Sequence, residues 1–252
     1  MLISVIVPTL NEESNLPVTL RQLAQRPDVE LIVVDGDSTD KTIAVARRYT
    51  PYVFLTAPGR ARQMNEGARH ATGDILLFLH ADTFLLPGAL DELQRRITGD
   101  GAVGGAFDLN IDSPQKLVHL IANLSSRRAR FFRTPYGDQG IFCWRQVFEE
   151  IGGFPDVPIL EDVAFVRRLR RAGRLTFLRT GLVTSARRWI ANGVIKTTLV
   201  NLLVRFLYAV RVPAQPLGRL YNAGLKRGGN RPPVSAGSPR QSQSATGQSS
   251  RG

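Results

Sequence analysis

The feature that most constrains the fold is an apolar run at residues 75–79 (Ile-Leu-Leu-Phe-Leu), which ends abruptly in His80, Ala81 and Asp82. Such a run, without polar alternation, is typical of a strand buried on both faces of an α/β sheet. A carboxylate at the carboxyl end of such a strand lies where open α/β sheets bind ligands. Asp82 is therefore a candidate binding residue, although Asp-Thr ahead of Pro87 also suits an ordinary turn or helix cap.

Strands and helices are predicted to alternate over the first part of the chain. Strands are expected at 2–8, 30–35, 51–57 and 75–80, and helices at 13–25, 38–49, 60–71 and from Pro87 onwards. This βαβαβαβ order predicts a mostly parallel sheet with right-handed crossovers. Later strands are expected at 103–109, 141–144 and 175–179, and later helices at 113–130, 145–151, 161–172 and 194–212.

The charge of the chain is strongly positive, with 33 lysines and arginines against 21 acids and a net charge of +12. This predicts an anionic partner, such as nucleotide phosphates, acidic lipid or nucleic acid, unless it reflects a general arginine bias. The single cysteine, Cys143, allows no internal disulfide, and its apolar neighbours predict a buried, inert thiol. The chain opens on a predicted strand rather than a signal peptide, and no uncharged apolar stretch of roughly 18 residues predicts a transmembrane helix.

Polar side chains follow three of the predicted buried strands. The first strand runs into Pro8, Thr9, Asn11 and Glu12, the second into Asp35 and Asp37, and the third into Asp82. Carboxylates at this edge can accept hydrogen bonds from a base or a ribose. The helix starts after Ser38 and Gly59 would direct N–H groups to the same edge, which suits phosphate. Each segment alone could be a capped turn, but together they predict a crevice.

These segments, in this order, resemble the family 2 nucleotide-sugar glycosyltransferases of GT-A fold. Residues 7–13 and 33–40 are similar to that family's first two donor-binding strands, with Gly36 and Asp37 in exchanged order. Residues 59–68 resemble the segment that reaches the nucleotide and diphosphate. His80-Ala81-Asp82 stands at the Asp-x-Asp position, with His in place of the first Asp. Residues 152–154 and 160–163 resemble the acceptor-side turn and the Glu-Asp motif.

The resemblance covers roughly residues 3–180. Residues 59–65 together with His-Ala-Asp are similar to a bacterial subgroup sometimes labelled arsenosugar-biosynthesis glycosyltransferases. The fold implied is a mixed α/β domain over 1–190, with a nucleotide-sugar half (1–100) and an acceptor half (101–190). A basic amphipathic helical extension is expected at 191–227. A tail rich in Gly, Ser, Pro and Gln at 228–252 is predicted to be disordered.

The resemblance also implies a donor site and a metal. The donor-binding residues would be Pro8, Thr9, Asn11, Glu12, Asp35, Asp37, Arg60, Arg62, Asn65 and His80. A divalent cation, Mn²⁺ or Mg²⁺, would stabilise the leaving diphosphate. Asp82 would be its main protein ligand. His80 would be either a second ligand, which favours Mn²⁺, or a hydrogen-bond partner of the site.

On the acceptor side, Asp162 is the candidate base and Glu161 its positioning partner. Both acids also suit the first turn of a helix. Single displacement predicts inversion at the anomeric carbon. Asp138 and Gln139 are candidates for facing the sugar or acceptor, unless 136–140 is a plain turn. Arg188 and Trp189 partly resemble an element of processive members and could close over the donor, or form a surface cation–π pair.

The extension contains one apolar helical face at 194–212: Leu199, Leu202, Leu203, Phe206, Leu207 and Val210. One interpretation is an interfacial helix on anionic lipid near a lipid-linked acceptor. The other is a helix packed on the domain or at a dimer interface.

The prediction is thus an inverting, metal-dependent enzyme that moves a sugar from a nucleoside-diphosphate sugar to a lipid, lipid-linked or small-molecule hydroxyl. It would be cytoplasmic, with peripheral contact at the inner face of the cytoplasmic membrane, and without a nucleic-acid partner. One alternative is a nucleotidyltransferase, although the first strand lacks the glycine-rich loop usual there. Another is a non-catalytic basic membrane- or nucleic-acid-binding module, which leaves the strands that end in Asp35 and Asp82 unexplained.

Overall fold

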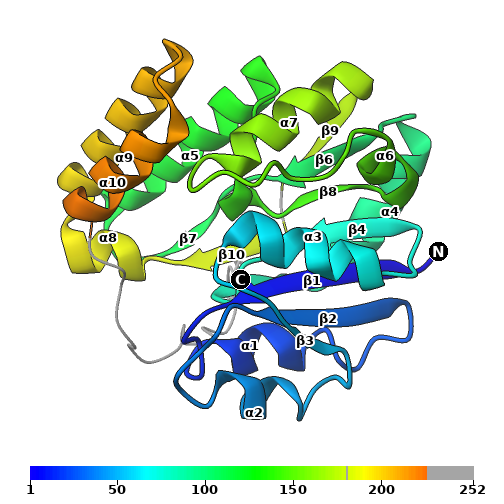
Figure 1. Cartoon of the computed structure of the whole chain (residues 1–252). Helices are drawn as coiled ribbons and strands as arrows, with labels where there is room; N and C mark the ends of the chain where they lie inside the picture. The colour runs from blue at the N-terminus through cyan, green and yellow to red at the C-terminus, as the bar shows by residue number, and fades with distance from the viewer. Residues whose placement is uncertain (180, 226–252) are drawn as a thin grey trace, which may run out of the picture.

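A seven-stranded sheet forms the centre of the computed structural model, which describes residues 1–179 and 181–225 (Figure 1). The strand order is β3-β2-β1-β4-β8-β6-β9, and β8 runs antiparallel to both of its neighbours while the other pairings are parallel. The predicted mixed, mostly parallel sheet flanked by helices is therefore confirmed. The strands are β1 (Ile3–Thr9), β2 (Val29–Asp35), β3 (Val53–Leu55), β4 (Ile75–Phe78), β6 (Gly104–Phe107), β8 (Ile141–Trp144) and β9 (Leu175–Leu178).

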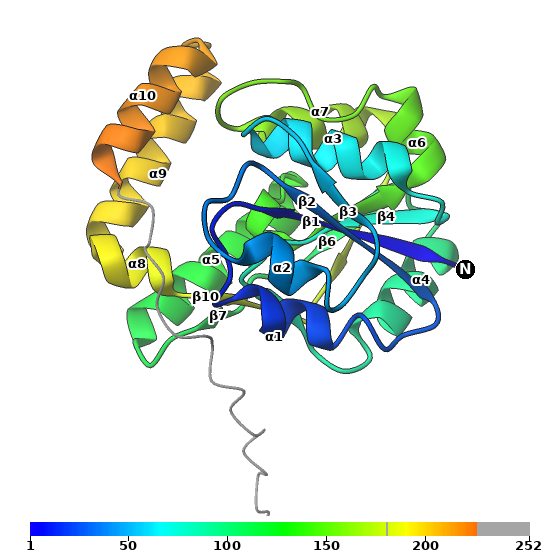
Figure 2. The same cartoon turned by 60° about the horizontal axis from the view of Figure 1, so that its bottom comes forward.

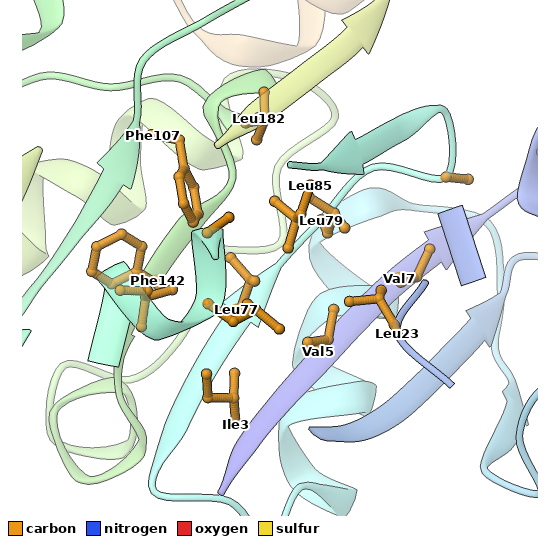
Figure 3. Packing of buried hydrophobic residues seen from close by; sticks show 14 of the residues in the cluster. Ile3, Val5, Val7, Leu23, Leu77, Leu79, Leu85, Phe107, Phe142 and Leu182 are labelled. Carbon is orange, nitrogen blue, oxygen red and sulfur yellow. The ribbon is translucent and has the colours of Figure 1, made fainter. Parts of the chain in front are cut away.

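The apolar run is buried on both faces, as predicted. Alternate side chains of β4 enter two different cores: Ile75 and Leu77 face one, and Leu76 and Phe78 face the other. Figure 3 shows Leu77 in the first core, among apolar side chains from β1, β8 and β6. Because these side chains are almost fully enclosed, truncating one of them to alanine should cost about 2–5 kcal/mol. The carboxyl end of β4 is therefore a rigid support.

Helices cover the two cores from opposite sides. The first core is covered by α1 (Leu16–Arg21), α2 (Thr42–Ala46), α4 (Ala89–Gly99) and α5 (Lys116–Phe132). The second is covered by α3 (Arg60–His70), α6 (Arg145–Glu150) and α7 (Glu161–Ala172). Cys143 lies in the second core, so its predicted burial is confirmed, and this burial raises the pKa of its thiol.

The first two helices are shorter than the predicted 13–25 and 38–49. A helix was expected to begin at Ser38, capped by Ser38 or Thr39, but Ser38 instead donates its backbone N–H and its hydroxyl to Asp35. Lys41 precedes α2, and its N–H binds the carboxylate of Glu13. These side-chain to backbone hydrogen bonds compete with helix formation. The loops after β1 and β2 are therefore hydrogen-bonded to each other instead of being helical.

A second, three-stranded sheet was not predicted. It has the order β5-β10-β7 and contains β5 (Thr83–Leu85), β7 (Ile111–Asp112) and β10 (Leu182–Ser185). The longest of these strands has four residues, too few for a hydrophobic period to be recognised. Their pairing joins distant parts of the chain, and the N–H of Ser185 donates to the carbonyl of Asp82 at 3.2 Å. This contact brings the segment after β10 to the end of β4.

The described part of the extension is mostly helical. It contains α8 (Arg187–Asn192), α9 (Val194–Ala209) and α10 (Ala214–Gly224), and α9 and α10 pack side by side (Figures 1 and 2). Among residues 1–179 and 181–225, no helix is both long and apolar enough to span a bilayer. The predicted tail at 228–252 lies outside the described residues, as do the last two residues of the predicted extension.

Candidate functional site

The carboxyl ends of β1, β2 and β4 meet at one edge of the sheet. Their register pairs Thr9 with Asp35 across β1 and β2, and Ile6 with Phe78 across β1 and β4. A small pocket, partly open to solvent, lies at this edge. Its lining includes Pro8, Arg60, Leu79, His80, Gly137 and Asp162. The fold thus brings four predicted site residues, from β1, α3, the end of β4 and α7, into one pocket.

Asp35 is fully buried at the end of β2, and its carboxylate is held by three hydrogen bonds. The Thr9 hydroxyl donates to it at 2.9 Å, and the backbone N–H and hydroxyl of Ser38 donate at 2.8 and 2.6 Å. A carboxylate offers about four lone-pair sites, so most of those of Asp35 are occupied within the protein. Asn11 and Asp37 have left-handed backbones (φ 57° and 72°) in the adjoining loops. Asn11 accepts the N–H of Thr39 at 2.9 Å, whereas Asp37 is exposed.

The need for glycine at position 36 comes from Gln63, a residue that the sequence analysis did not identify. The amide of Gln63 in α3 is buried and donates to the carbonyls of Thr9 at 2.7 Å and Val34 at 2.9 Å. A Cβ on residue 36 would lie 2.9 Å from the Gln63 amide nitrogen. The exchanged Gly36-Asp37 order therefore leaves space for an amide that ties β1, β2 and α3 together.

Arg187 joins two of the predicted site acids. Its guanidinium makes a two-pronged pair with Glu12, with Nη1 at 2.7 Å from Oε2, and its Nε lies 2.9 Å from Oδ2 of Asp82. All three side chains are at least four-fifths buried. Burial disfavours the charge of Arg187, but the hydrogen bonds to Glu12 and the charge of Asp82 outweigh it and raise the arginine pKa. Arg187 follows Glu12 by 175 residues, so no local pattern could have identified it.

A metal at the end of β4 would have to be held mainly by phosphate oxygens. Asp82 supplies one carboxylate that already faces a cationic group, the Arg187 guanidinium. Burial lowers the pKa of His80 well below its ordinary value, and three nearby arginines lower it further, so the imidazole is neutral, the form that binds metals. Within the described part of the chain, no cluster of three or more His, Cys, Asp or Glu residues could hold a metal unaided. Mg²⁺ and Mn²⁺ sites in which substrate phosphates complete the shell need only one or two protein ligands.

Asp162 and His80 flank the same point of the pocket. A Cβ on Gly137 would lie 3.3 Å from both Oδ2 of Asp162 and Nε2 of His80. The Gly137 N–H donates to Oδ2 of Asp162 at 2.7 Å, which orients the carboxylate. Glu161, which is 5% exposed, lies 3.5 Å from Nη1 of Arg60. Burial raises the pKa of Glu161 against the opposing charge of Arg60.

In the 136–140 loop, Gln139 binds backbone groups of the loop and of β6, and one oxygen of Asp138 has no partner among the described residues. Gln139 is fully buried, accepts the Tyr136 N–H at 3.0 Å and donates to the Phe107 carbonyl at 3.1 Å, so both ends of its amide fix the loop. Oδ1 of Asp138 is buried without a hydrogen-bond partner among the described residues. Burial raises the pKa of Asp138, although neighbouring arginines oppose the shift.

Other predicted residues are engaged outside the pocket lining. Arg62 pairs with Asp156 at 2.9 Å at the surface. The Asn65 amide binds both the N–H and the carbonyl of Phe154, at 2.9 and 2.8 Å, and thereby fixes the turn at 152–154. Arg188 donates to the hydroxyl of Tyr221 at 2.9 Å. Trp189 packs against the first core, so it is not an exposed partner for a cation–π pair.

Solved structures share this fold at low sequence identity. TarS of S. aureus, solved with UDP-GlcNAc, is 18% identical, with a TM-score of 0.59 over 89% of this chain and 79% of that chain. A mannosyltransferase from Pyrobaculum calidifontis, solved with GDP-Man and Mn²⁺, is 24% identical, with a TM-score of 0.59 over 88% of this chain and 69% of that chain. These likenesses establish the GT-A fold.

Similarity in sequence identifies the family as well as the fold. A PGL/p-HBAD biosynthesis glycosyltransferase of Mycobacterium tuberculosis is 40% identical over 251 residues, which cover 79% of this chain and 96% of the relative. An uncharacterised protein of the same species is 37% identical over 113 residues, and the match spans about a third (35%) of that relative's length. The family model for glycosyl transferase family 2 matches residues 4–151. The chain therefore belongs to glycosyltransferase family 2.

Proposed function

We propose that this enzyme transfers a sugar from a nucleoside-diphosphate sugar to an acceptor hydroxyl, with inversion at the anomeric carbon. The observation that carries the proposal is the meeting of Arg60, His80 and Asp162 in one pocket at the carboxyl edge of the sheet. Membership of family 2 supports the reaction class. UDP-GlcNAc and GDP-Man, present in the structures of the two related folds, support the donor class.

The donor lies across the ends of β1 and β2. Asp35, held by Thr9 and Ser38, accepts an N–H of the base, and the loops carrying Asn11, Glu12 and Asp37 surround the nucleoside. Arg60 points its charge toward the acids of the pocket and is available to the diphosphate. Pro8 forms an apolar wall beside it.

A divalent metal, when bound, would neutralise the leaving diphosphate. Asp82 would hold it, with His80 as a second ligand or as a hydrogen-bond partner of the phosphate. Arg187 would then share the Asp82 carboxylate with the metal or stay on Glu12, which it binds through two separate nitrogens.

Asp162 takes the proton of the acceptor hydroxyl. The Gly137 N–H holds one of its oxygens in place, and Glu161 holds Arg60 beside it. Asp138 and the fixed 136–140 loop shape the acceptor side, and Arg188 brings a positive charge close to both His80 and Asp138. Displacement from the face opposite the leaving diphosphate gives inversion. For the acceptor we propose a lipid or lipid-linked hydroxyl, because α9 exposes apolar side chains.

The test pairs donor binding with transfer. Thermal unfolding is measured with a panel of nucleoside-diphosphate sugars, with Mn²⁺ and with a chelator, and one donor should stabilise the enzyme only when the metal is present. Asp162→Asn should keep this donor-dependent stabilisation but slow transfer by about 10²–10⁴-fold. Asp91→Asn, the same change at an exposed surface pair, is the control.

Normal transfer by Asp162→Asn would show that Asp162 is not the base. If no nucleotide sugar stabilises the enzyme with or without metal, the donor class is wrong. Analysis of the product's anomeric configuration by NMR decides between inversion and retention.

A further inference from the structure

Most of the large apolar side chains of α9 lie on its outward face, not on the face that packs on the protein. The side chains that α9 buries are Thr197 and Val204. Large apolar side chains between 48% and 68% exposed lie on the other side: Ile195, Leu199, Leu202, Leu203 and Phe206. At the helical period these residues fall within one arc about 100° wide, opposite Thr197 and Val204. The apolar face is therefore not used for packing on the domain, which was one of the two interpretations of the sequence.

The neighbouring helix α5 also carries large apolar side chains on its outward face. It buries Val118 and the small residues Ala122, Ser126 and Ala129. On its opposite face it exposes Leu117 (46%), Leu120 (53%), Leu124 (55%) and Phe131 (82%). Monomeric soluble proteins seldom expose apolar patches on two adjacent helices without a partner for them. We call the outward faces of α5 and α9 together the apolar flank.

Contacts of Tyr136 place the two helices next to each other. The guanidinium of Arg128 in α5 lies 3.8 Å from the centroid of the Tyr136 ring, and that of Arg205 in α9 lies 3.5 Å from it. One ring thus bridges both helices. Figures 1 and 2 show α5, α8 and α9 on the same side of the molecule.

The charge around the apolar flank has one sign. The sequence has no Asp or Glu from residue 113 to residue 137, and none after Asp162. The exposed cations of 113–137 and of α8, α9 and α10 with their connections are Lys116, Arg127, Arg133, Arg188, Lys196, Arg211 and Arg219. An apolar face rimmed by cations and free of acids complements the surface of an anionic bilayer. It does not complement a second copy of itself, because two such faces would bring cations against cations.

We infer that the apolar flank, formed by α5 together with α9, docks on an anionic lipid bilayer. Apolar side chains enter the headgroup boundary and the surrounding cations contact lipid phosphates. This deepens the proposed lipid-acceptor function, because it would hold the enzyme at the surface where such an acceptor is found. Docking involves no sugar transfer, so it can be tested apart from the reaction.

The test is vesicle co-sedimentation of the full chain, with phosphatidylglycerol-containing vesicles compared with pure phosphatidylcholine vesicles. Binding should require phosphatidylglycerol and weaken as salt is raised. Phe206→Ser in α9 and Leu124→Ser in α5 should each weaken partitioning by about tenfold, because each removes an apolar side chain from the contact. Arg211→Gln should weaken it by about fivefold. Leu55→Ser, the same type of change at a leucine on β3 that is 60% exposed, should leave binding unchanged.

The outcomes separate the possible occupants. If phosphatidylglycerol vesicles are not bound, or if Phe206→Ser and Leu124→Ser bind as tightly as the wild type, the inference is wrong. If only Phe206→Ser weakens binding, α5 is not part of the surface. A dimer detected by analytical ultracentrifugation without lipid, and dissociated by Phe206→Ser, would assign the flank to a second copy. Transfer to a water-soluble acceptor, measured in parallel, reports on the catalytic proposal whatever the vesicles show.

Discussion

Replacing Arg187 by methionine should destabilise the protein, and the size of the loss tests whether Arg187 neutralises Glu12 and Asp82. The change keeps most of the side-chain volume but leaves Glu12 and Asp82, with side chains 13% and 14% exposed, without their cation. Removing one partner of a buried ion pair typically costs 3–5 kcal/mol. Because part of each carboxylate still reaches water, we expect the lower end, about 3 kcal/mol. For a domain of this size that corresponds to a fall in Tm of about 6–12 °C.

The assay is thermal and urea unfolding of the wild type and Arg187→Met, with chelator and with Mn²⁺. Mn²⁺ should raise the Tm of Arg187→Met more than that of the wild type, because the two freed carboxylates can share the ion. Adding Glu12→Gln and Asp82→Asn to Arg187→Met should recover stability, since no uncompensated buried charge remains. Arg96→Met, at an exposed pair, should cost at most about 1 kcal/mol. A Tm of Arg187→Met equal to that of the wild type would refute the bridge.

Two further substitutions test packing and buried charge. Gly67→Ala should cost about 1–3 kcal/mol in urea unfolding, because an added Cβ would overlap the Ile6 side chain where α3 meets β1. Gly99→Ala, where a Cβ meets nothing within 4 Å, should be neutral or stabilising, and equal effects of the two changes would contradict the close approach. Asp138→Asn should stabilise the protein above about pH 4 and have no effect at more acid pH. Burial raises the folded-state pKa of Asp138, so the wild type loses stability as pH rises through that pKa and the asparagine does not. Unfolding curves of both proteins from acid to neutral pH measure the difference, and a constant offset would argue against a raised pKa.

Local patterns were enough to predict the elements that frame the pocket. The uniform apolar run of β4 required burial on both faces, and the polar residues after β1, β2 and β4 had to meet at one edge once the strands were parallel. The α7 helix was also predicted with its observed bounds, because its acidic first turn, apolar period and closing glycine agree. Local reasoning did less well where side chains bind backbone across loops, as in the shortened α1 and α2.

Asn65 and Gln139 show that a polar residue in a segment near the pocket need not be free to bind a ligand. Both lie in segments that the sequence indicated, but their amides are bonded to backbone, so they fix turns beside the pocket. An amide in a sequence does not reveal its partner, since a carbonyl or N–H close enough to bind it can come from anywhere in the chain.

The sequence by itself determined the α/β class, the buried strands and the edge at which Asp35 and Asp82 lie, because these follow from periodicity and strand direction over a few residues. Only the tertiary structure decided that Arg187 bridges Glu12 and Asp82 and that Asp162 faces His80 across Gly137. It also decided that the apolar face of α9 points outward, although the sequence had identified that face. A helical period states that one face is apolar; which way it turns depends on non-local packing, here of Thr197 and Val204 against the protein.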